Sequence, residues 1–291
     1  MEQLLEYVCP YDKSVLEKTR ESHICPNCAK LFPIKDGIPN FLSHDLDDES
    51  EIYLEVLDKW GQDDSVDYGD PFRNAIEIPH VLRLLGSKPG DLVLDAACGK
   101  GRVAFPWISR ADVRLVGLDF SHAALTGMRK KTPATAPVQL AKADIACVPF
   151  LPGQFDGVLA LGLLPCLPNA NAIAAVLQGL QGALKAGGTL VISAVNWSEA
   201  TRAIRPKVGY RAGSPNFLRM FDYDEFGDWL SRYFEVVSID CLIHQIPKVT
   251  TPIQKYAPAG LILNRWVDIM FRRTPWARRN SWLLVGKCRL K

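Results

Sequence analysis

The stretch VLDAACGKGRVAF, at positions 93 to 105, combines an acidic residue with glycines in a spacing that suits a nucleotide-like ligand. Gly99 and Gly101 lack a Cβ atom, so a ligand can approach the backbone and the first amides of a following helix. Two kinds of ligand fit this turn. The spacing Gly99-x-Gly101-x-x-Ala104 matches a dinucleotide fingerprint, whereas Asp95 ahead of the glycines suits a nucleoside that carries a cationic tail.

Two further acidic residues separate these ligands. Asp119 follows the second predicted strand, 18 residues after Gly101, where a carboxylate accepts hydrogen bonds from both hydroxyls of a ribose. Asp144 follows the third strand and suits the amino group of an adenine, and Ile145 suits its ring face. The negative charge of Asp95 would repel the pyrophosphate of a dinucleotide. No tyrosine is followed by a lysine four residues later, as in short-chain dehydrogenases, so the pattern favours a nucleoside with an amino-acid tail.

The segments that carry these residues alternate between strand and helix patterns. Such alternation predicts an α/β fold with a mostly parallel sheet and helices on both faces. One helix is expected to begin near Arg102, directly after the glycines. The other clear helices are predicted at 74–85, 171–186 and 222–233, and the strands at 92–96, 114–118, 138–142, 157–161, 188–195, 234–242 and 282–289.

With these motifs, residues 86–291 resemble the class I S-adenosylmethionine-dependent methyltransferases. The resemblance rests on LDAACGKG, VGLDFS, AKADIACVPF, GQFDGVLALGLL and LKAGGTLVIS, and Ala97 replaces the family's usual first glycine. It looks most like the ubiquinone and menaquinone biosynthesis branch. The family implies a Rossmann-like seven-stranded sheet whose last strand is antiparallel, and S-adenosyl-L-methionine as cofactor. The residues that it implies for cofactor binding are Asp95, Ala97, Gly99, Gly101, Asp119, Phe120, Asp144, Ile145 and Leu161.

Residues 1–43 carry cysteines in the pattern of a small metal-binding module. Cys25 and Cys28 form a complete Cys-x-x-Cys knuckle, and Cys9 begins a second one in which Asp12 replaces the second cysteine. Zinc also accepts oxygen and imidazole ligands, so Asp12 or His23 is the expected fourth ligand of a structural zinc. The segment resembles zinc-ribbon proteins that partner tRNA and protein methyltransferases, and the ribbon of bacterial ribosomal-RNA guanine-N1 methyltransferases. A ribbon without metal is the alternative.

Charge is distributed unevenly along the chain, although the net charge is only +2. Residues 1–70 hold 6 Lys and Arg against 17 Asp and Glu, whereas residues 245–291 hold 10 against 1. We interpret 44–85 as an acidic linker with lid helices, one of them near 51–60, between the ribbon and the methyltransferase domain. The start of the chain lacks a signal-peptide pattern, and no apolar run approaches the length of a membrane span. A cytoplasmic protein is therefore expected.

No catalytic side chain stands out in the sequence. His80, His122 and His244 are isolated, and none of them is favoured as a general base. Pro165-Cys166 lies where cytosine-C5 methyltransferases carry a Pro-Cys nucleophile, but the flanking residues of that motif are absent. Cys166 is therefore interpreted as part of a pocket wall.

The insertion at 245–280 bears on the methyl acceptor. Its apolar residues are interleaved with arginines as in an interfacial segment, which favours a small-molecule or lipid-like acceptor, O- or C-methylation and peripheral membrane contact through 259–282. A helix packed on the domain with its arginines in water is the other interpretation of this insertion. The alternative is an RNA base methyltransferase, with Trp276 and Trp282 as stacking partners for the bases. The acidic first third of the chain disfavours RNA binding. The residues concerned are Leu261, Ile262, Trp266, Ile269 and Met270, and Arg265, Arg272, Arg273, Arg278 and Arg279.

Overall fold

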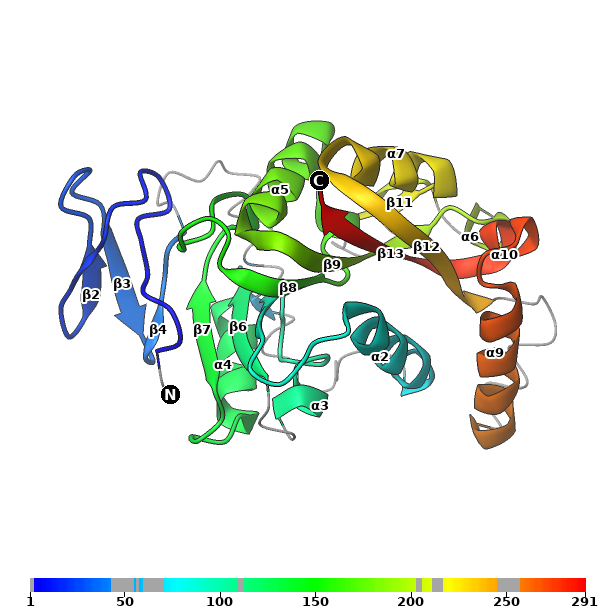
Figure 1. Ribbon diagram of the computed structural model, residues 1–291, viewed down its shortest axis with the longest axis horizontal. Coiled ribbons are helices and arrows are strands. Elements are labelled where there is room, and N and C mark those ends of the chain that lie inside the picture. The colour runs from blue at the N-terminus through cyan, green and yellow to red at the C-terminus, as the bar shows by residue number, and fades with distance from the viewer. Residues whose placement is uncertain are drawn as a thin grey trace. The chain divides into compact units, whose positions relative to one another are not determined.

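The structure is a computed structural model that divides into two compact units (Figure 1). The first unit comprises Met1–Tyr68, Ser87–Leu159 and Ala174–Gly188, and the second comprises Gly69–Gly86, Ala160–Ile173 and Thr189–Lys291. The residues that the structure describes are 3–42, 55, 58–59, 71–108, 113–202, 206–210, 217–244 and 257–291.

The first unit is built on four parallel strands. Their order is β8-β5-β6-β7, and their bounds are β5 (Leu92–Ala96), β6 (Arg114–Asp119), β7 (Val138–Lys142) and β8 (Phe155–Ala160). Apolar side chains dominate these strands and most are buried, as expected for a parallel sheet with both faces covered. The sequence prediction is confirmed for all four strands, to within two residues at each end.

The helices of this unit begin and end at residues that the sequence placed only roughly. Helix α3 (Phe105–Ile108) starts later than the predicted Arg102, because Gly101 O accepts hydrogen bonds from Ala104 N and Phe105 N in a turn. Helix α4 (His122–Lys131) is capped by the Ser121 hydroxyl, which accepts from Ala124 N. Helix α5 (Ala170–Ala183) ends three residues before the predicted end, because strand β9 (Leu184–Asn196) begins directly after it.

The N-terminal residues form a four-stranded antiparallel sheet within the first unit. Its strands, in the order β1-β2-β3-β4, are β1 (Glu17–Lys18), β2 (Ser22–Ile24), β3 (Leu31–Lys35) and β4 (Ile38–Pro39). An isolated parallel bridge joins Asn40 to Lys142 at the edge strand β7, and Phe41 N donates to Lys142 O at 2.7 Å. The small sheet therefore covers the outer edge of β7.

The second unit contains the remaining predicted strands. Strand β13 (Ser281–Leu290) runs antiparallel to both β9 and β12 (Phe234–His244), as the family resemblance implies for the last strand. Helix α7 (Tyr223–Tyr233) has a capping box of Asp222 and Glu225, and α2 (Pro71–Leu85) ends before Gly86, whose φ is +64°.

Several elements of this unit were not predicted from the sequence. They are β10 (Val208–Tyr210), β11 (Phe217–Phe221), α6 (Glu199–Arg202) and α10 (Pro275–Asn280). Helix α9 (Ala257–Phe271) lies in the insertion whose apolar residues are interleaved with arginines, but its bounds were not predicted. Strand β11 pairs in parallel with the end of β9, so the expected seven strands are extended by two. Among the described residues, no helix is long and apolar enough to cross a membrane.

Candidate cofactor and metal sites

Three acidic residues lie at the carboxyl ends of adjacent strands of the first unit. Asp95 is paired in register with Gly117 on β6, and Asp119 at the end of β6 is paired with Lys142 at the end of β7. Asp144 follows β7 by two residues. Because the strands are parallel, their carboxyl ends meet at one edge, which is where open α/β sheets bind ligands. Leu161, which directly follows β8, belongs to the second unit.

The loop after β5 is held in a left-handed conformation. Ala97, Gly99 and Gly101 have φ values of 64°, 54° and 87°. This conformation costs a non-glycine residue about 1–2 kcal/mol, so Ala97 is a strained replacement for the family's glycine. A Cβ on Gly101 would lie 2.9 Å from Met128 Cγ. Glycine is therefore needed at 101 for close packing against helix α4, as well as for the turn.

Asp119 braces this loop through both of its carboxylate oxygens. Oδ2 accepts a hydrogen bond from Gly99 N at 2.7 Å, and Oδ1 accepts one from Ser121 N at 2.8 Å. Burial raises the pKa of Asp119, while these backbone hydrogen bonds lower it. A carboxylate offers about four lone-pair positions, so two acceptor positions are left for a ligand such as the two hydroxyls of a ribose.

Asp95 is the most deeply buried acid at this edge, with 4% of its surface exposed. Burial raises its pKa from 3.8 to about 7, with Arg102 lowering it and Asp119 raising it. An ionised carboxylate in such surroundings is costly unless a cation pairs with it. The position is therefore suited to an ammonium group that a ligand brings in.

The residues expected at the adenine are also at this edge. The Asp144 side chain caps the short helix η1 (Ile145–Cys147) by accepting from Ala146 N at 2.8 Å, and burial raises its pKa. Ile145 is 3% exposed. Phe120, directly after Asp119, is half-buried.

Asp58 is a residue that sequence reasoning missed. Its Oδ1 accepts from Ser121 Oγ at 2.7 Å and from Ala123 N at 3.3 Å, at the N-terminus of α4, where negative charge is favourable. Asp58 also contributes to the raised pKa of Asp119. Glu55, Asp58 and Lys59 are helical. The other residues of the helix predicted at 51–60 lie outside the described residues.

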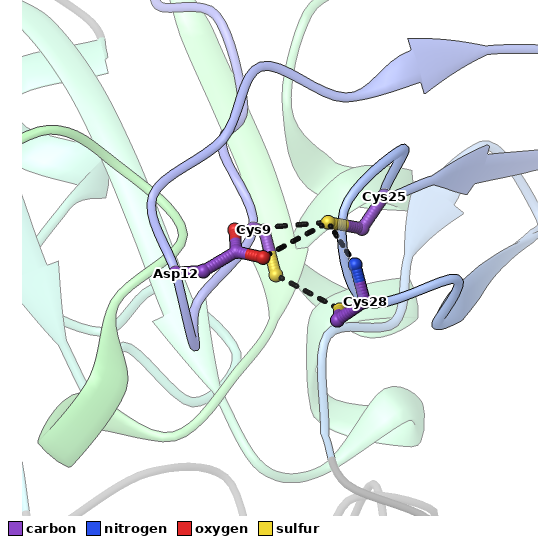
Figure 2. A group of neighbouring side chains, drawn as sticks. All are labelled: Cys9, Asp12, Cys25 and Cys28. Atoms are coloured by element: carbon purple, nitrogen blue, oxygen red, sulfur yellow. Dashed lines mark hydrogen bonds between the residues drawn. The ribbon is translucent and has the colours of Figure 1, made fainter.

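A second cluster of ligating side chains lies in the N-terminal sheet (Figure 2). Ligand atoms of Cys9, Asp12, Cys25 and Cys28 all lie within 4.8 Å of one another. Cys9 Sγ is 3.7 Å from Cys28 Sγ, and Cys25 Sγ is 3.3 Å from Asp12 Oδ2. Three thiolates and one carboxylate form a donor set that zinc accepts.

The two halves of this cluster have matching backbone geometry. Cys9 O accepts from Lys13 N at 2.9 Å, and Cys25 O accepts from Ala29 N at 3.0 Å. Lys13 and Ala29 are both left-handed, with φ values of 62° and 57°. Cys9-x-x-Asp12 is thus a second knuckle with the conformation of Cys25-x-x-Cys28. His23, the alternative ligand, lies outside the cluster and packs against Tyr7 and Phe41.

The interpretation of three histidines as isolated is wrong, because each is paired with a carboxylate. His80 Nε2 is 3.0 Å from Asp240 Oδ2, and His122 Nε2 is 3.0 Å from Asp36 Oδ2. The third pair is His244 Nδ1 with Asp268 Oδ1, where the His244 ring stacks on Trp276. His80 and His244 are buried, as expected for packed histidines.

Cys166 lies in the short helix η2 (Leu164–Cys166) of the second unit. Its Sγ donates to Gly162 O at 3.4 Å. The role of Cys166 as a wall residue stays a prediction.

Comparison with known proteins agrees with the fold. Residues 93–188 match a family model described as a methyltransferase domain. A curated relative, the 2-phytyl-1,4-naphtoquinone methyltransferase of Synechocystis sp., is 35% identical over 113 residues, which cover 37% of this chain and 46% of that protein. The chain thus spans about half the length of the curated relatives it matches.

Solved structures extend the likeness over more of the chain. One is a complex between the Haloferax volcanii Trm112 methyltransferase activator and the putative methyltransferase, with a TM-score of 0.58 and 18% identity, covering 80% of this chain and 97% of that one. Another is the N-methyltransferase NodS of Bradyrhizobium japonicum with S-adenosyl-L-homocysteine, with a TM-score of 0.52 and 18% identity, covering 84% and 99%. The chain therefore has the Rossmann-like α/β fold of S-adenosylmethionine-dependent methyltransferases.

Proposed function

We propose that the chain is an S-adenosylmethionine-dependent methyltransferase that acts on a small-molecule or lipid-like acceptor. The observation that carries the proposal is that Asp95, Asp119 and Asp144 lie together at the carboxyl ends of β5, β6 and β7. The segment that contains them matches a methyltransferase domain. In this proposal Asp95 binds the ammonium group of the cofactor, Asp119 binds the ribose, and Asp144 with Ile145 binds the adenine. Ala97, Gly99, Gly101 and Phe120 complete the cofactor contacts within the first unit, and the contact expected for Leu161 stays a prediction.

In methyl transfer, the main contribution of the protein is to bind and orient the reactants. S-adenosylmethionine, when bound, supplies a methyl group that its positive sulfur already activates. The residues of the chain hold the adenosine and the amino-acid tail, so that an acceptor nucleophile can approach in line while water is kept out. Such positioning accounts for up to about 7–11 kcal/mol of a barrier. No side chain is assigned as a general base.

The acceptor class is supported by relatives rather than by a described pocket. The curated relative named above acts, by its name, on a naphthoquinone that carries a phytyl chain, and the basic, apolar insertion of this chain suits a lipid-like molecule. Methylation of an RNA base remains the alternative outcome of the experiment below.

Incubating the purified chain with methyl-labelled S-adenosylmethionine and a cell extract tests the function and the acceptor together. We expect label in the lipid or small-molecule fraction. Label in RNA would replace the acceptor class but keep the activity. Failure to label any fraction, with a chain that binds the cofactor, would contradict the methyltransferase proposal. An Asp119→Ala variant provides the control for transfer that depends on the site.

We also propose that Cys9, Asp12, Cys25 and Cys28 hold a structural zinc ion. The donors come from two knuckles of the same conformation, and Cys28 N donates to Cys25 Sγ at 3.4 Å, a backbone contact that suits a metal-bound thiolate. Four protein ligands leave no open position for a water, so the metal would stabilise the fold without reacting. The boundaries of this module, 1–43, stay a prediction.

The first knuckle is hydrogen-bonded to the segment that follows the proposed adenine site. Val8 N donates to Pro149 O at 3.0 Å, and Lys13 Nζ donates to Val148 O at 2.8 Å. Val8 and Lys13 directly flank the knuckle from Cys9 to Asp12. The N-terminal module is also paired with Lys142, so segment 143–147, which contains Asp144 and Ile145, is anchored at both ends. If the knuckle loses its structure, the geometry of the proposed adenine site should therefore change as well.

The zinc prediction is tested by metal content and cofactor affinity together. The purified chain should carry about one zinc per molecule, and Cys28→Ser should lose most of it, as measured by elemental mass spectrometry. The same variant should bind S-adenosylmethionine several-fold more weakly. Asp12→Cys, which restores a fourth thiolate, should retain the metal more tightly. A wild-type chain purified without zinc that takes none up would contradict the assignment, and Cys288→Ser is the control for loss of a cysteine far from the cluster in sequence.

A further inference from the structure

Helix α9 in the second unit presents an apolar face to solvent. Ile262, Trp266, Ile269 and Met270 are 61%, 62%, 59% and 66% exposed, and Leu263 is 46% exposed. At about 100° per residue, the first four lie within an arc of about 100° on one side of the helix. We call these five residues the α9 apolar face. Contiguous exposed apolar surface of this kind marks an interaction site rather than an ordinary solvated helix.

The charges beside the α9 apolar face are positive. Arg265 and Arg273 are exposed on the same helix or directly after it, and Arg278 and Arg279 are exposed on α10. Asp268 is the single acidic residue in 245–291. It is buried and bonded to His244, and it also lines the pocket described below. The surface therefore combines apolar side chains with an excess of arginines, of which Arg273 is paired with Asp240.

A pocket between α2 and α9 adds a place for an anion. Ile76, Pro79, Leu242 and Ile269 form its apolar part, and its polar lining consists of Arg83, Arg265 and Arg272 together with His80 and Asp268. We call it the arginine pocket. Arg265 Nη2 donates to Ala75 O at 2.7 Å, and Arg83 Nη2 lies 2.7 Å from His80 Nδ1. Neutral acceptors thus orient these two arginines, and within the described part of the chain no carboxylate forms a salt bridge with either.

Buried Asp240 explains why the pocket keeps its positive charge. Burial raises the pKa of Asp240, but hydrogen bonds from His80 and Arg273 lower it below its usual range, so the carboxylate is ionised. Asp240 is hydrogen-bonded to His80 Nε2 at 3.0 Å, and it forms ion pairs with Arg272 and Arg273. Asp240 therefore neutralises the residues behind the pocket and leaves Arg83 and Arg265 for an outside anion.

We propose that the arginine pocket binds the phosphate of an anionic phospholipid and that the α9 apolar face lies in the bilayer interface around it. A lipid surface offers an anion and apolar area side by side. A free phosphate leaves the apolar face in water, and a second copy of the same face brings arginines against arginines. The inference extends the proposed function, since a lipid-like acceptor is reached at such a surface, but vesicle binding itself needs neither cofactor nor methyl transfer.

Flotation of the full chain with vesicles tests the proposal. We expect binding to phosphatidylcholine vesicles with about 30% phosphatidylglycerol to exceed binding to pure phosphatidylcholine at least tenfold, and to weaken at about 0.5 M salt. Arg83→Gln and Arg265→Gln should each weaken it about fivefold. Trp266→Ser should weaken it about tenfold, because it removes a large apolar contact.

Matched controls come from the N-terminal sheet. Val15 is 66% exposed, and Arg20 is exposed as well. Val15→Ser and Arg20→Gln should leave vesicle binding unchanged. Trp266→Phe should still bind but should lose part of the blue shift of tryptophan emission that vesicles produce. The thermal melting of every variant shows whether it is folded.

Three results would overturn the proposal. Equal binding to neutral and anionic vesicles would exclude a pocket that recognises an anionic headgroup. A concentration-dependent dimer in light scattering that Trp266→Ser dissociates, without vesicle binding, would assign the face to a second copy. Stabilisation by inorganic phosphate that Arg83→Gln removes, without vesicle binding, would assign the pocket to a free anion. Cofactor affinity measured in the same variants separates these outcomes from failure of the proposed function.

Discussion

Replacing Asp119 by alanine is expected to weaken binding of S-adenosylmethionine by at least about 100-fold. In the proposed site this carboxylate accepts hydrogen bonds from both ribose hydroxyls, and each hydrogen bond to a charged group contributes about 1.5–3 kcal/mol. Two of them correspond to roughly two to four powers of ten in the dissociation constant. Calorimetric titration with S-adenosylmethionine and S-adenosyl-L-homocysteine measures the loss, and both ligands should lose affinity equally because they share the ribose.

The same substitution also removes the brace of the cofactor loop. Without the carboxylate, Gly99 N and Ser121 N lose their acceptors, so part of the effect comes from the loop and part from the ribose. Asp119→Asn separates the two, because one amide oxygen can still accept from the backbone, and its loss of affinity should be intermediate. Asp224 is exposed in the second unit, and Asp224→Ala should bind as the wild type does. An Asp119→Ala chain that melts normally and binds within threefold of wild type would contradict the site.

The strands were the part of the fold that the sequence predicted best. Buried parallel strands appear as continuous apolar runs between turn residues, and β5 and β7 lie at the predicted residues. Boundaries at glycines were less certain: the helix predicted over 171–186 ends at Ala183, and Gly187 and Gly188 both lie inside β9. Strands β10 and β11 were missed because they are short and follow no alternation of apolar and polar residues.

In the candidate sites, too, contacts between residues close in sequence could be predicted, whereas contacts between distant residues could not. The place of Asp12 followed from spacing, because a knuckle is set by four consecutive residues and their turn. The partners of the histidines could not be predicted, since His80 and Asp240 are 160 residues apart and His122 and Asp36 are 86 apart. Asp58 was missed for the same reason, being 63 residues from Ser121. Pairs of this kind depend on the fold.

Replacing Asp95 by asparagine is expected to stabilise the empty protein above pH 7 while weakening its cofactor binding. The folded pKa of Asp95 is about 7, above the ordinary value of 3.8 for an aspartate. Between these values the folded state keeps a proton that the unfolded state has released, so rising pH lowers the free energy of unfolding. The cost reaches about 4 kcal/mol above pH 7, at 1.36 kcal/mol per unit. Asparagine has no charge to bury, so it avoids this cost.

The stability difference between Asp95→Asn and the wild type should therefore be small near pH 4, grow up to about pH 7 and then stay constant. Chemical denaturation of both chains over this range measures it, and taking the difference cancels the titration of the other groups they share. We expect the variant to be more stable by about 1–3 kcal/mol at pH 8, less than the full cost, because the buried amide must also find hydrogen-bond partners.

Cofactor affinity should move in the opposite direction, because a bound ammonium group supplies the cation that the buried carboxylate lacks. In the wild type, affinity should rise with pH up to about 7 as Asp95 ionises, whereas the variant should show a flatter profile and bind about 10 to 100-fold more weakly. A structural acid would give the stability change alone. Only an acid that awaits a cationic ligand gives both signs in one substitution, so a variant that gains stability and keeps its affinity would remove Asp95 from the site.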